Sequence, residues 1–270
     1  MKKHLSAVTA FVFLSTYCLA QSITNPKGIS VRPVTIDVST APGNTESKRV
    51  LITNGLDVKK QFIVYVSDWL RDTTGGHIYS EPSESPRSCA TWIETDKSFF
   101  ELEPGQTEEL YLKVSAPSDS NTKVQMRWCM LFIETTQEKK VKDTTGFTTT
   151  IASRFRVGVH IYLTPEGVKH KELKLLQFIT PNNQLNKYRM VCQNTGETQL
   201  NCTGYLELSS LSDGSRIKLP VIEFPIFPDQ IRYLDFTIPE STPKGKYTLT
   251  GIIDAGEEVP LEAAQILIEL

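Results

Sequence analysis

Residues 99–114 read FFELEPGQTEELYLKV, with apolar side chains at alternate positions on both sides of a Pro-Gly pair. Alternation of this kind is typical of a strand that buries one face, and Pro-Gly is typical of a tight turn. The segment therefore predicts two short strands, one on each side of Pro104 and Gly105, whose apolar faces point into the same core.

A second copy of this pattern follows 124 positions later, where residues 223–239 read EFPIFPDQIRYLDFTIP. The offset aligns Pro104 with Pro228 and Gln106 with Gln230, and it also aligns the apolar positions. The aligned apolar pairs are Phe100 with Phe224, Leu102 with Ile226, Leu110 with Leu234, Leu112 with Phe236 and Val114 with Ile238.

Two further segments recur in the same order. RVLITNG (49–55) parallels RMVCQNTG (189–196), and RWCMLFIE (127–134) parallels YTLTGIID (247–254). Chance alternation in a β-rich sequence does not easily produce three matches in one order. We therefore expect an all-β chain in which each half is one β-sandwich.

The first twenty residues have the pattern of a cleavable export signal, with a basic start, an apolar stretch (LSAVTAFVFLSTY) and CLA ending at Ala20. We expect the mature chain to begin at Gln21 and to reside in the periplasm or cell envelope. A lipoprotein alternative would make Cys18 the lipidated residue, but Tyr17 is larger than the small residue that such sites normally carry. No other run is long and apolar enough to predict a membrane span.

The charge balance is mild. Removing Lys2 and Lys3 leaves 27 basic against 31 acidic residues. Nucleic-acid binding needs a basic face, so the composition argues against a nucleic-acid partner.

Four cysteines remain after the signal, two in each half. Even pairing in an oxidising compartment favours two disulfides, Cys89 with Cys129 and Cys192 with Cys202, over free thiols. A metal site is a weaker interpretation, because no pair has CxxC spacing and no histidine adjoins a cysteine. The sequence predicts no metal and no cofactor.

The boundary between the halves is expected near LTPEGVKHKEL (163–173). Pro165 cannot donate to a strand ladder and Gly167 frees the backbone, so residues 164–171 are predicted to be the linker. The predicted division is a signal peptide at 1–20, one sandwich at 21–165 and a second at 166–270.

Four segments of the first half resemble, in order, motifs of the periplasmic pilus chaperones, the PapD-like family of immunoglobulin-like sandwiches. They are SKRVLITNGLDVKKQFIVYVSDW (47–69), ATWIETDKSFFELEPGQTEELYLKV (90–114), MRWCMLFIE (126–134) and SRFRVGVHIYLTP (153–165). The second half resembles generic immunoglobulin-like modules of surface and envelope proteins, in NTGETQL, PKGKYTLTGIID and EEVPLEAAQILIEL. The resemblance implies two tandem immunoglobulin-like β-sandwich domains.

The resemblance also implies a function. Members of the family hold a pilus subunit by lending it a strand, and an arginine and a lysine in a cleft grip the subunit's terminal carboxylate. In this chain the lysine position holds His160, and the nearest candidate for the arginine is Arg32. Histidine is close to neutral at pH 7, so it would clamp a carboxylate more weakly than lysine.

The candidate partner-binding residues lie on the last strand of the first half. Phe155, Val157, Val159, Ile161 and Leu163 alternate with a second face that carries Arg154, Arg156, Gly158, His160 and Tyr162. One interpretation is an amphipathic strand that completes its own sheet. The other is an edge strand that also pairs with a protein client. The basic residues would give the cleft beside Pro165 a positive charge.

Other conspicuous residues have ordinary interpretations. His77 is expected in a loop without a special role, and Trp69, Trp92 and Trp128 are expected in the core. Catalytic signatures such as GxSxG, HExxH or a phosphate loop are absent from the sequence, so an enzyme is not expected.

Two functions of different class remain. One is an exported chaperone-like protein that binds subunits of a surface appendage or an outer-membrane or envelope assembly. The alternative is a non-chaperone envelope scaffold or adhesion module that binds a protein or glycan partner.

Overall fold

The computed structural model describes residues 27–118, 124–142, 148–181 and 186–270, with the backbone alone for 137–142 and 148–152. The predicted signal peptide and Cys18 lie outside the described residues. Within the described part of the chain, no helix has the length and apolar character needed to cross a membrane.

Strands make up nearly all of the regular structure, which confirms the all-β class. In the first half they are β1 (Gly28–Arg32), β2 (Thr35–Val38), β3 (Thr45–Gly55), β4 (Lys60–Arg71), β5 (His77–Ser80), the 3₁₀ helix η1 (Ala90–Trp92), β6 (Ile93–Thr95), β7 (Phe99–Leu102), β8 (Thr107–Ser115), β9 (Arg127–Lys142) and β10 (Thr148–Leu163). In the second half they are β11 (Leu173–Ile179), β12 (Lys187–Asn194), β13 (Leu200–Ser210), β14 (Arg216–Lys218), β15 (Ile222–Ile226), β16 (Ile231–Thr237), β17 (Lys246–Asp254) and β18 (Glu262–Glu269).

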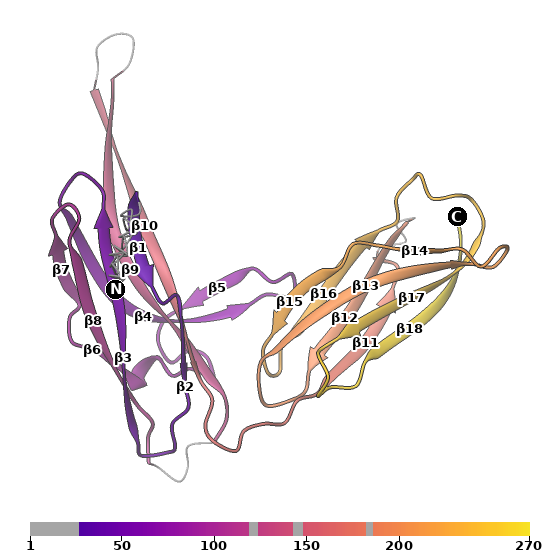
Figure 1. The fold of residues 1–270 in the computed structure, drawn as a ribbon, viewed down its shortest axis with the longest axis horizontal. Helices are drawn as coiled ribbons and strands as arrows, with labels where there is room; N and C mark the ends of the chain where they lie inside the picture. Colours follow the sequence, from indigo (N-terminus) through magenta and orange to yellow (C-terminus); the bar gives the residue numbers. More distant parts are fainter. Residues whose placement is uncertain (1–26, 119–123, 143–147, 182–185) are drawn as a thin grey trace, which may run out of the picture.

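The first half is one sandwich of two sheets. One sheet has the order β1-β3-β8-β6, and the other has the order β2-β10-β9-β4-β5 with β7 beside β4. The inward residues of both sheets form a single apolar core, in which Ile52, Leu110, Leu131 and Ile161 are fully buried. Strands β9 and β10 continue beyond this sandwich as a long hairpin (Figure 1).

The second half is a separate sandwich with its own core. Its sheets have the orders β11-β12-β16 and β14-β13-β17-β18, with β15 beside β13. Met190, Leu206 and Leu249 are fully buried between them. In the described residues no strand of the first half pairs with a strand of the second. Figure 1 shows two lobes set at an angle and joined by the segment between β10 and β11.

The repeated sequence forms the same corner in both sandwiches. In the first, Asn54 is fully buried; its Nδ2 donates to the carbonyls of Val58 (2.9 Å) and Leu102 (3.0 Å), and its Oδ1 accepts from Leu56 N–H (3.1 Å). One side chain therefore ties the turn after β3 to the end of β7.

Asn194 has the same role in the second sandwich. Its Nδ2 donates to the carbonyls of Thr198 (2.8 Å) and Ile226 (3.0 Å), and its Oδ1 accepts from Gly196 N–H (2.9 Å). The prolyl turns also match, since Gly105 N–H donates to the Asn54 carbonyl (2.7 Å) and Asp229 N–H donates to the Asn194 carbonyl (2.9 Å).

The two corners differ at the turn residue. Gly105 has φ 78° and Asp229 has φ 68°, so both occupy the left-handed region. Glycine enters this region freely, whereas aspartate enters it less readily. The second corner thus carries a carboxylate at a position where the first carries no side chain.

Candidate partner-binding surface

Strand β10 has one fully paired edge and one edge that is open over most of its length. It pairs with β9 from Thr148 to Leu163. On the other side, β2 runs parallel to it only from His160 to Leu163. No described strand covers the second edge between Thr148 and Val159, so its outward N–H and C=O groups are free to pair with another chain.

The apolar residues of β10 divide into two groups along the strand. Val159, Ile161 and Leu163 are buried in the core of the first sandwich. Val157 packs against the margin of that core, and Phe155 is 45% exposed. The predicted alternation is present, but only Phe155 and Val157 lie beside the open edge and offer apolar surface to a partner.

The other face of β10 carries the predicted basic residues. The side chain of Arg154 is 82% exposed and its Nε lies 3.8 Å from Glu134. The guanidinium of Arg156 lies over the rings of Tyr79 (4.8 Å) and Phe132 (4.5 Å), an arrangement that favours a cation. Arg154 therefore contributes exposed positive charge, whereas aromatic rings hold Arg156 in place.

Arg32 and His160 lie in different sheets. Arg32 ends β1 and is opposite Leu51 in the four-stranded sheet. His160 is opposite Thr35 of β2 in the six-stranded sheet. The basic pair implied by the family resemblance is therefore not formed by neighbouring strand positions, and a threonine is the residue beside His160.

His160 lies among aromatic rings on the outer face of the six-stranded sheet. Its ring centroid is 4.9 Å from that of Trp69 and 5.8 Å from that of Tyr162. Burial lowers the pKa of His160, and the neighbouring His77 lowers it further. The imidazole is therefore neutral at pH 7 and is not a cationic clamp.

The same aromatic cluster continues into the second sandwich. Phe227 is fully buried; its ring packs edge-on against that of Trp69 (5.1 Å between centroids) and lies tilted against that of Trp128 (4.9 Å). Trp69 and Trp128 are buried as predicted, but they fill the junction between the sandwiches and not the core of the first.

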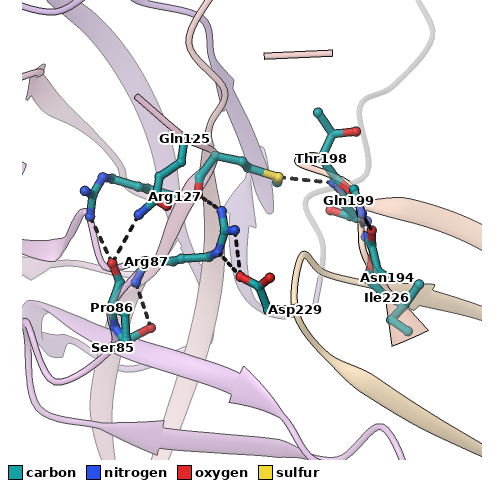
Figure 2. A network of polar contacts seen from close by, with 12 residues as sticks. Ser85, Pro86, Arg87, Gln125, Arg127, Asn194, Thr198, Gln199, Ile226 and Asp229 are labelled. Atoms are coloured by element: carbon teal, nitrogen blue, oxygen red, sulfur yellow. Dashed lines mark hydrogen bonds and ion pairs between the residues drawn. The ribbon is translucent and has the colours of Figure 1, made fainter. Parts of the chain in front are cut away.

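Polar contacts reinforce this junction. The guanidinium of Arg87 donates to one carboxylate oxygen of Asp229 from Nε (2.9 Å) and from Nη2 (2.7 Å), and its Nη1 donates to the Met126 carbonyl (3.1 Å). Figure 2 shows these contacts beside the backbone N–H of Gln199, which donates to the sulfur of Met126. Asp229, whose backbone is in the left-handed region, thus brings its carboxylate into contact with Arg87 of the first sandwich.

The turn between β4 and β5 also contacts the second sandwich. Tyr233 N–H donates to the carbonyl of Thr73 at 2.7 Å. The guanidinium of Arg232 approaches Gly75 so closely that a Cβ there would lie 1.9 Å from its Nη1. Buried N–H groups of Arg71 and Arg232 have no acceptor among the described residues. The junction therefore has unused hydrogen-bond donors for an anion.

Two cavities open at this junction. One, of about 750 Å³, lies between the end of β4, the loop at Ser85 and Arg87, and the second corner at Pro228. The other, of about 600 Å³, lies beside the linker and includes Tyr162, Lys169 and Lys171 in its walls. A third cavity, of about 540 Å³, has Pro165 in its wall at the position of the expected cleft, and it shares Tyr162, Thr164 and Lys169 with the second. Lys169 and Lys171 lie in the predicted linker. The sequence pattern did not indicate them as binding residues because they belong to no strand.

The four cysteines are buried free thiols in this structure. The Sγ atoms of Cys89 and Cys129 are 3.4 Å apart, farther than the roughly 2.05 Å of a disulfide bond. Cys192 and Cys202 lie in the core of the second sandwich, on strands of opposite sheets. The structure thus brings the first predicted pair together without a bond, and both disulfides stay predictions.

The solved structures that are similar to this chain include those of fimbrial chaperones. No family model and no curated protein matches it. Among solved structures it is similar to the class 5 fimbriae chaperone CfaA, with 12% identity, a TM-score of 0.47, and coverage of 89% of this chain and 98% of that one. It is also similar to the YadV chaperone, with 12% identity, a TM-score of 0.46, and coverage of 90% and 99%.

A third similar structure is a complex. The CsuC–CsuE chaperone–tip adhesion subunit pre-assembly complex of Acinetobacter baumannii matches with 13% identity and a TM-score of 0.44, over 76% of this chain and 89% of that one. Because these identities and TM-scores are low, we infer the function from the geometry of this chain.

Proposed function

We propose that this protein is an exported, chaperone-like protein that binds subunits of a surface appendage or envelope assembly through β10 and the adjoining interdomain cleft. The observation that carries the proposal is the open edge of β10 between Thr148 and Val159. Phe155 and Val157 supply apolar side chains beside that edge.

The physical basis is strand addition. A client whose own sandwich lacks a strand has an apolar groove and unpaired backbone groups along it. Strand β10 would supply backbone partners, and its alternate side chains would fill the groove. Complete burial of an exposed phenylalanine side chain contributes roughly 1.5–3 kcal/mol, so covering the 45% of Phe155 that is exposed would contribute about 0.7–1.4 kcal/mol to the affinity.

The cleft would add electrostatic selectivity. Arg154, Lys169 and the unused N–H groups of Arg71 and Arg232 are positive groups near β10 and the junction. They favour an acidic segment or a carboxylate of the client. His160 adds little to this charge because it is neutral at pH 7.

The location and the domain division belong to the same proposal. We place the protein in the periplasm, on the strength of the predicted signal peptide. We also propose that residues 21–165 and 166–270 fold as independent units, since each half has its own sheets and its own core.

The test compares Phe155→Asp with a matched control, Tyr111→Asp. Tyr111 is an aromatic side chain of similar exposure (49%) on β8, in the opposite sheet. Partners are captured from a periplasmic extract with each folded variant and quantified. A substitution at Val159 is unsuitable, because that side chain is fully buried and its loss would unfold the sandwich.

We expect Phe155→Asp to lose the client and Tyr111→Asp to retain it. Equal recovery by both variants would show that the β10 edge does not bind the client. The function as an envelope scaffold or adhesion module, with a protein or glycan partner bound elsewhere, would then be preferred.

A further inference from the structure

Two arginines, one from each sandwich, meet at the turn of the β4–β5 hairpin, which reaches the second lobe (Figure 1). Arg71 ends β4, and Arg232 is the second residue of β16. The Nη1 of Arg71 donates to the Gly75 carbonyl at 2.8 Å. The guanidinium of Arg232 lies against the same glycine, where an added Cβ would be 1.9 Å from its Nη1 and 2.2 Å from its Cζ. Both guanidinium groups therefore contact one residue.

Neither guanidinium has all of its hydrogen-bond donors satisfied. The Nε of Arg71 and the Nε and Nη1 of Arg232 are shielded from water and have no acceptor among the described residues. A buried donor without an acceptor costs free energy, and a charged donor costs more than a neutral one. In the described part of the chain, the arginines that do form ion pairs are others, namely Arg49, Arg87, Arg154, Arg189 and Arg216.

The local charge is also unbalanced. Burial lowers the pKa of Arg232, and the positive charge of Arg71 lowers it further, while Asp72 acts in the opposite direction. The Oδ1 of Asp72 is already occupied, because it accepts from Thr74 N–H, Thr74 Oγ1 and Gly76 N–H, each at 2.8 Å. Two guanidinium charges against one carboxylate leave a net charge of +1 at the hairpin turn. An anion bound here would supply the missing acceptor and the missing charge.

We propose that Arg71 and Arg232 bind a small oxyanion, a phosphate or a carboxylate, which joins the two sandwiches. Arginine binds such oxygens through charge-assisted hydrogen bonds. The cavity of about 750 Å³ has Arg71 in its wall and gives the anion a path from solvent. Arg87 lies in the same wall but is already paired with Asp229, so it is not the anion's partner.

The protein positions the two arginines before the anion arrives. The hydrogen bond from Tyr233 N–H to the Thr73 carbonyl (2.7 Å) holds β16 on the hairpin turn. Without an anion the two guanidinium groups repel each other, so removing one of them relieves a cost. With an anion the folded protein gains stability that depends on the anion concentration. The inference goes beyond the proposed function, because the anion binds the free protein without a client.

The experiment titrates the full chain, without a client, with sodium phosphate and separately with sodium acetate at pH 7.5. Sodium chloride at the same ionic strength is the reference. Affinity is measured by calorimetry, and the melting temperature is measured in each salt. Arg71→Gln and Arg232→Gln are compared with a matched control, Arg216→Gln, which removes an arginine of β14 whose side chain is 73% exposed.

We expect one oxyanion per chain, bound roughly tenfold or more weakly by Arg71→Gln and by Arg232→Gln and equally well by Arg216→Gln. The anion should raise the melting temperature of the wild type and of Arg216→Gln, and should leave that of the other two variants unchanged. Tighter binding of phosphate than of acetate would identify a phosphate site, and the reverse order would identify a carboxylate site.

Two results would overturn the proposal. One is that neither anion binds, or that both bind the wild type, Arg71→Gln and Arg232→Gln with equal affinity. The other concerns chloride alone, where Arg232→Gln should melt at or above the wild-type temperature. A clearly lower temperature would show that the Arg232 charge is already compensated in the free protein. Because no client is present, failure of the proposed function in the capture experiment would not affect this test.

Discussion

Replacing Asn54 with alanine tests the role of the repeated corner. The side chain is fully buried and makes three hydrogen bonds, two as donor to the carbonyls of Val58 and Leu102 and one as acceptor from Leu56. A net contribution of about 1 kcal/mol for each bond predicts a loss of about 3 kcal/mol from the stability of the first sandwich.

The chain provides a selective assay for this loss. Trp69 and Trp128 contact Phe227 of the second sandwich, whereas Trp92 packs against the core of the first. All variants therefore carry Trp69→Phe and Trp128→Phe, so that the fluorescence of Trp92, the remaining tryptophan, reports the first sandwich. With a urea m-value of about 2 kcal/mol/M, a loss of 3 kcal/mol lowers the midpoint by about 1.5 M. Circular dichroism, which detects strands in both halves, reports the second sandwich as well.

Asn194→Ala is the matched control in the second sandwich. It removes three hydrogen bonds of similar length. We expect it to leave the fluorescence midpoint unchanged and to lower the midpoint of a circular-dichroism transition. If Asn54→Ala lowers the fluorescence midpoint by less than about 0.3 M, the corner is not the stabilising element inferred here. If Asn194→Ala lowers it as much as Asn54→Ala does, the two halves do not unfold independently.

Three further predictions concern the junction, the pH response and the thiols. Arg87→Ala and Asp229→Gly should each widen the distribution of interdomain angles seen by small-angle X-ray scattering, because both remove the ion pair while glycine keeps the left-handed turn; unchanged scattering would show that this contact does not set the angle. Burial lowers the pKa of His160 from its usual 6.5, so the unfolded chain binds more protons and the first sandwich loses stability as pH falls below about 6.5. The fall in melting temperature between pH 7 and pH 5 should be smaller in His160→Phe, and an identical fall would contradict this. Peptide mapping of periplasmic material under non-reducing conditions should recover both predicted disulfides, whereas four free thiols would show that the cysteines act only as core residues.

The sequence was most informative where one side chain determines local geometry. The alternation around Pro104 and Pro228 and the two asparagines predicted paired corners, and Asn54 and Asn194 make equivalent hydrogen bonds. The alternation in residues 155–163 predicted the apolar face of β10, of which Val159, Ile161 and Leu163 are buried in the core whereas Phe155 is exposed. Both patterns are local, so period-two reasoning is sufficient to find them.

Contacts between distant segments could not be predicted in this way. His77 was expected to have no special role, yet hairpin β4–β5 brings it to His160. Arg32 was a candidate for the cleft, yet the register of β2 places Thr35 beside His160. The ion pair of Arg87 with Asp229 depends on the angle between the two sandwiches, which no repeat in the sequence encodes.

The central claim, that a client strand pairs with the open edge of β10, is tested most directly by amide hydrogen exchange on the complex with its captured client. The amides of residues 153–157 that point away from β9 are unpaired in the described structure and should exchange quickly in the free protein. The account predicts that client binding slows them markedly, and less so in Phe155→Asp at equal concentration. Unchanged exchange in this segment, together with protection at another surface, would contradict it.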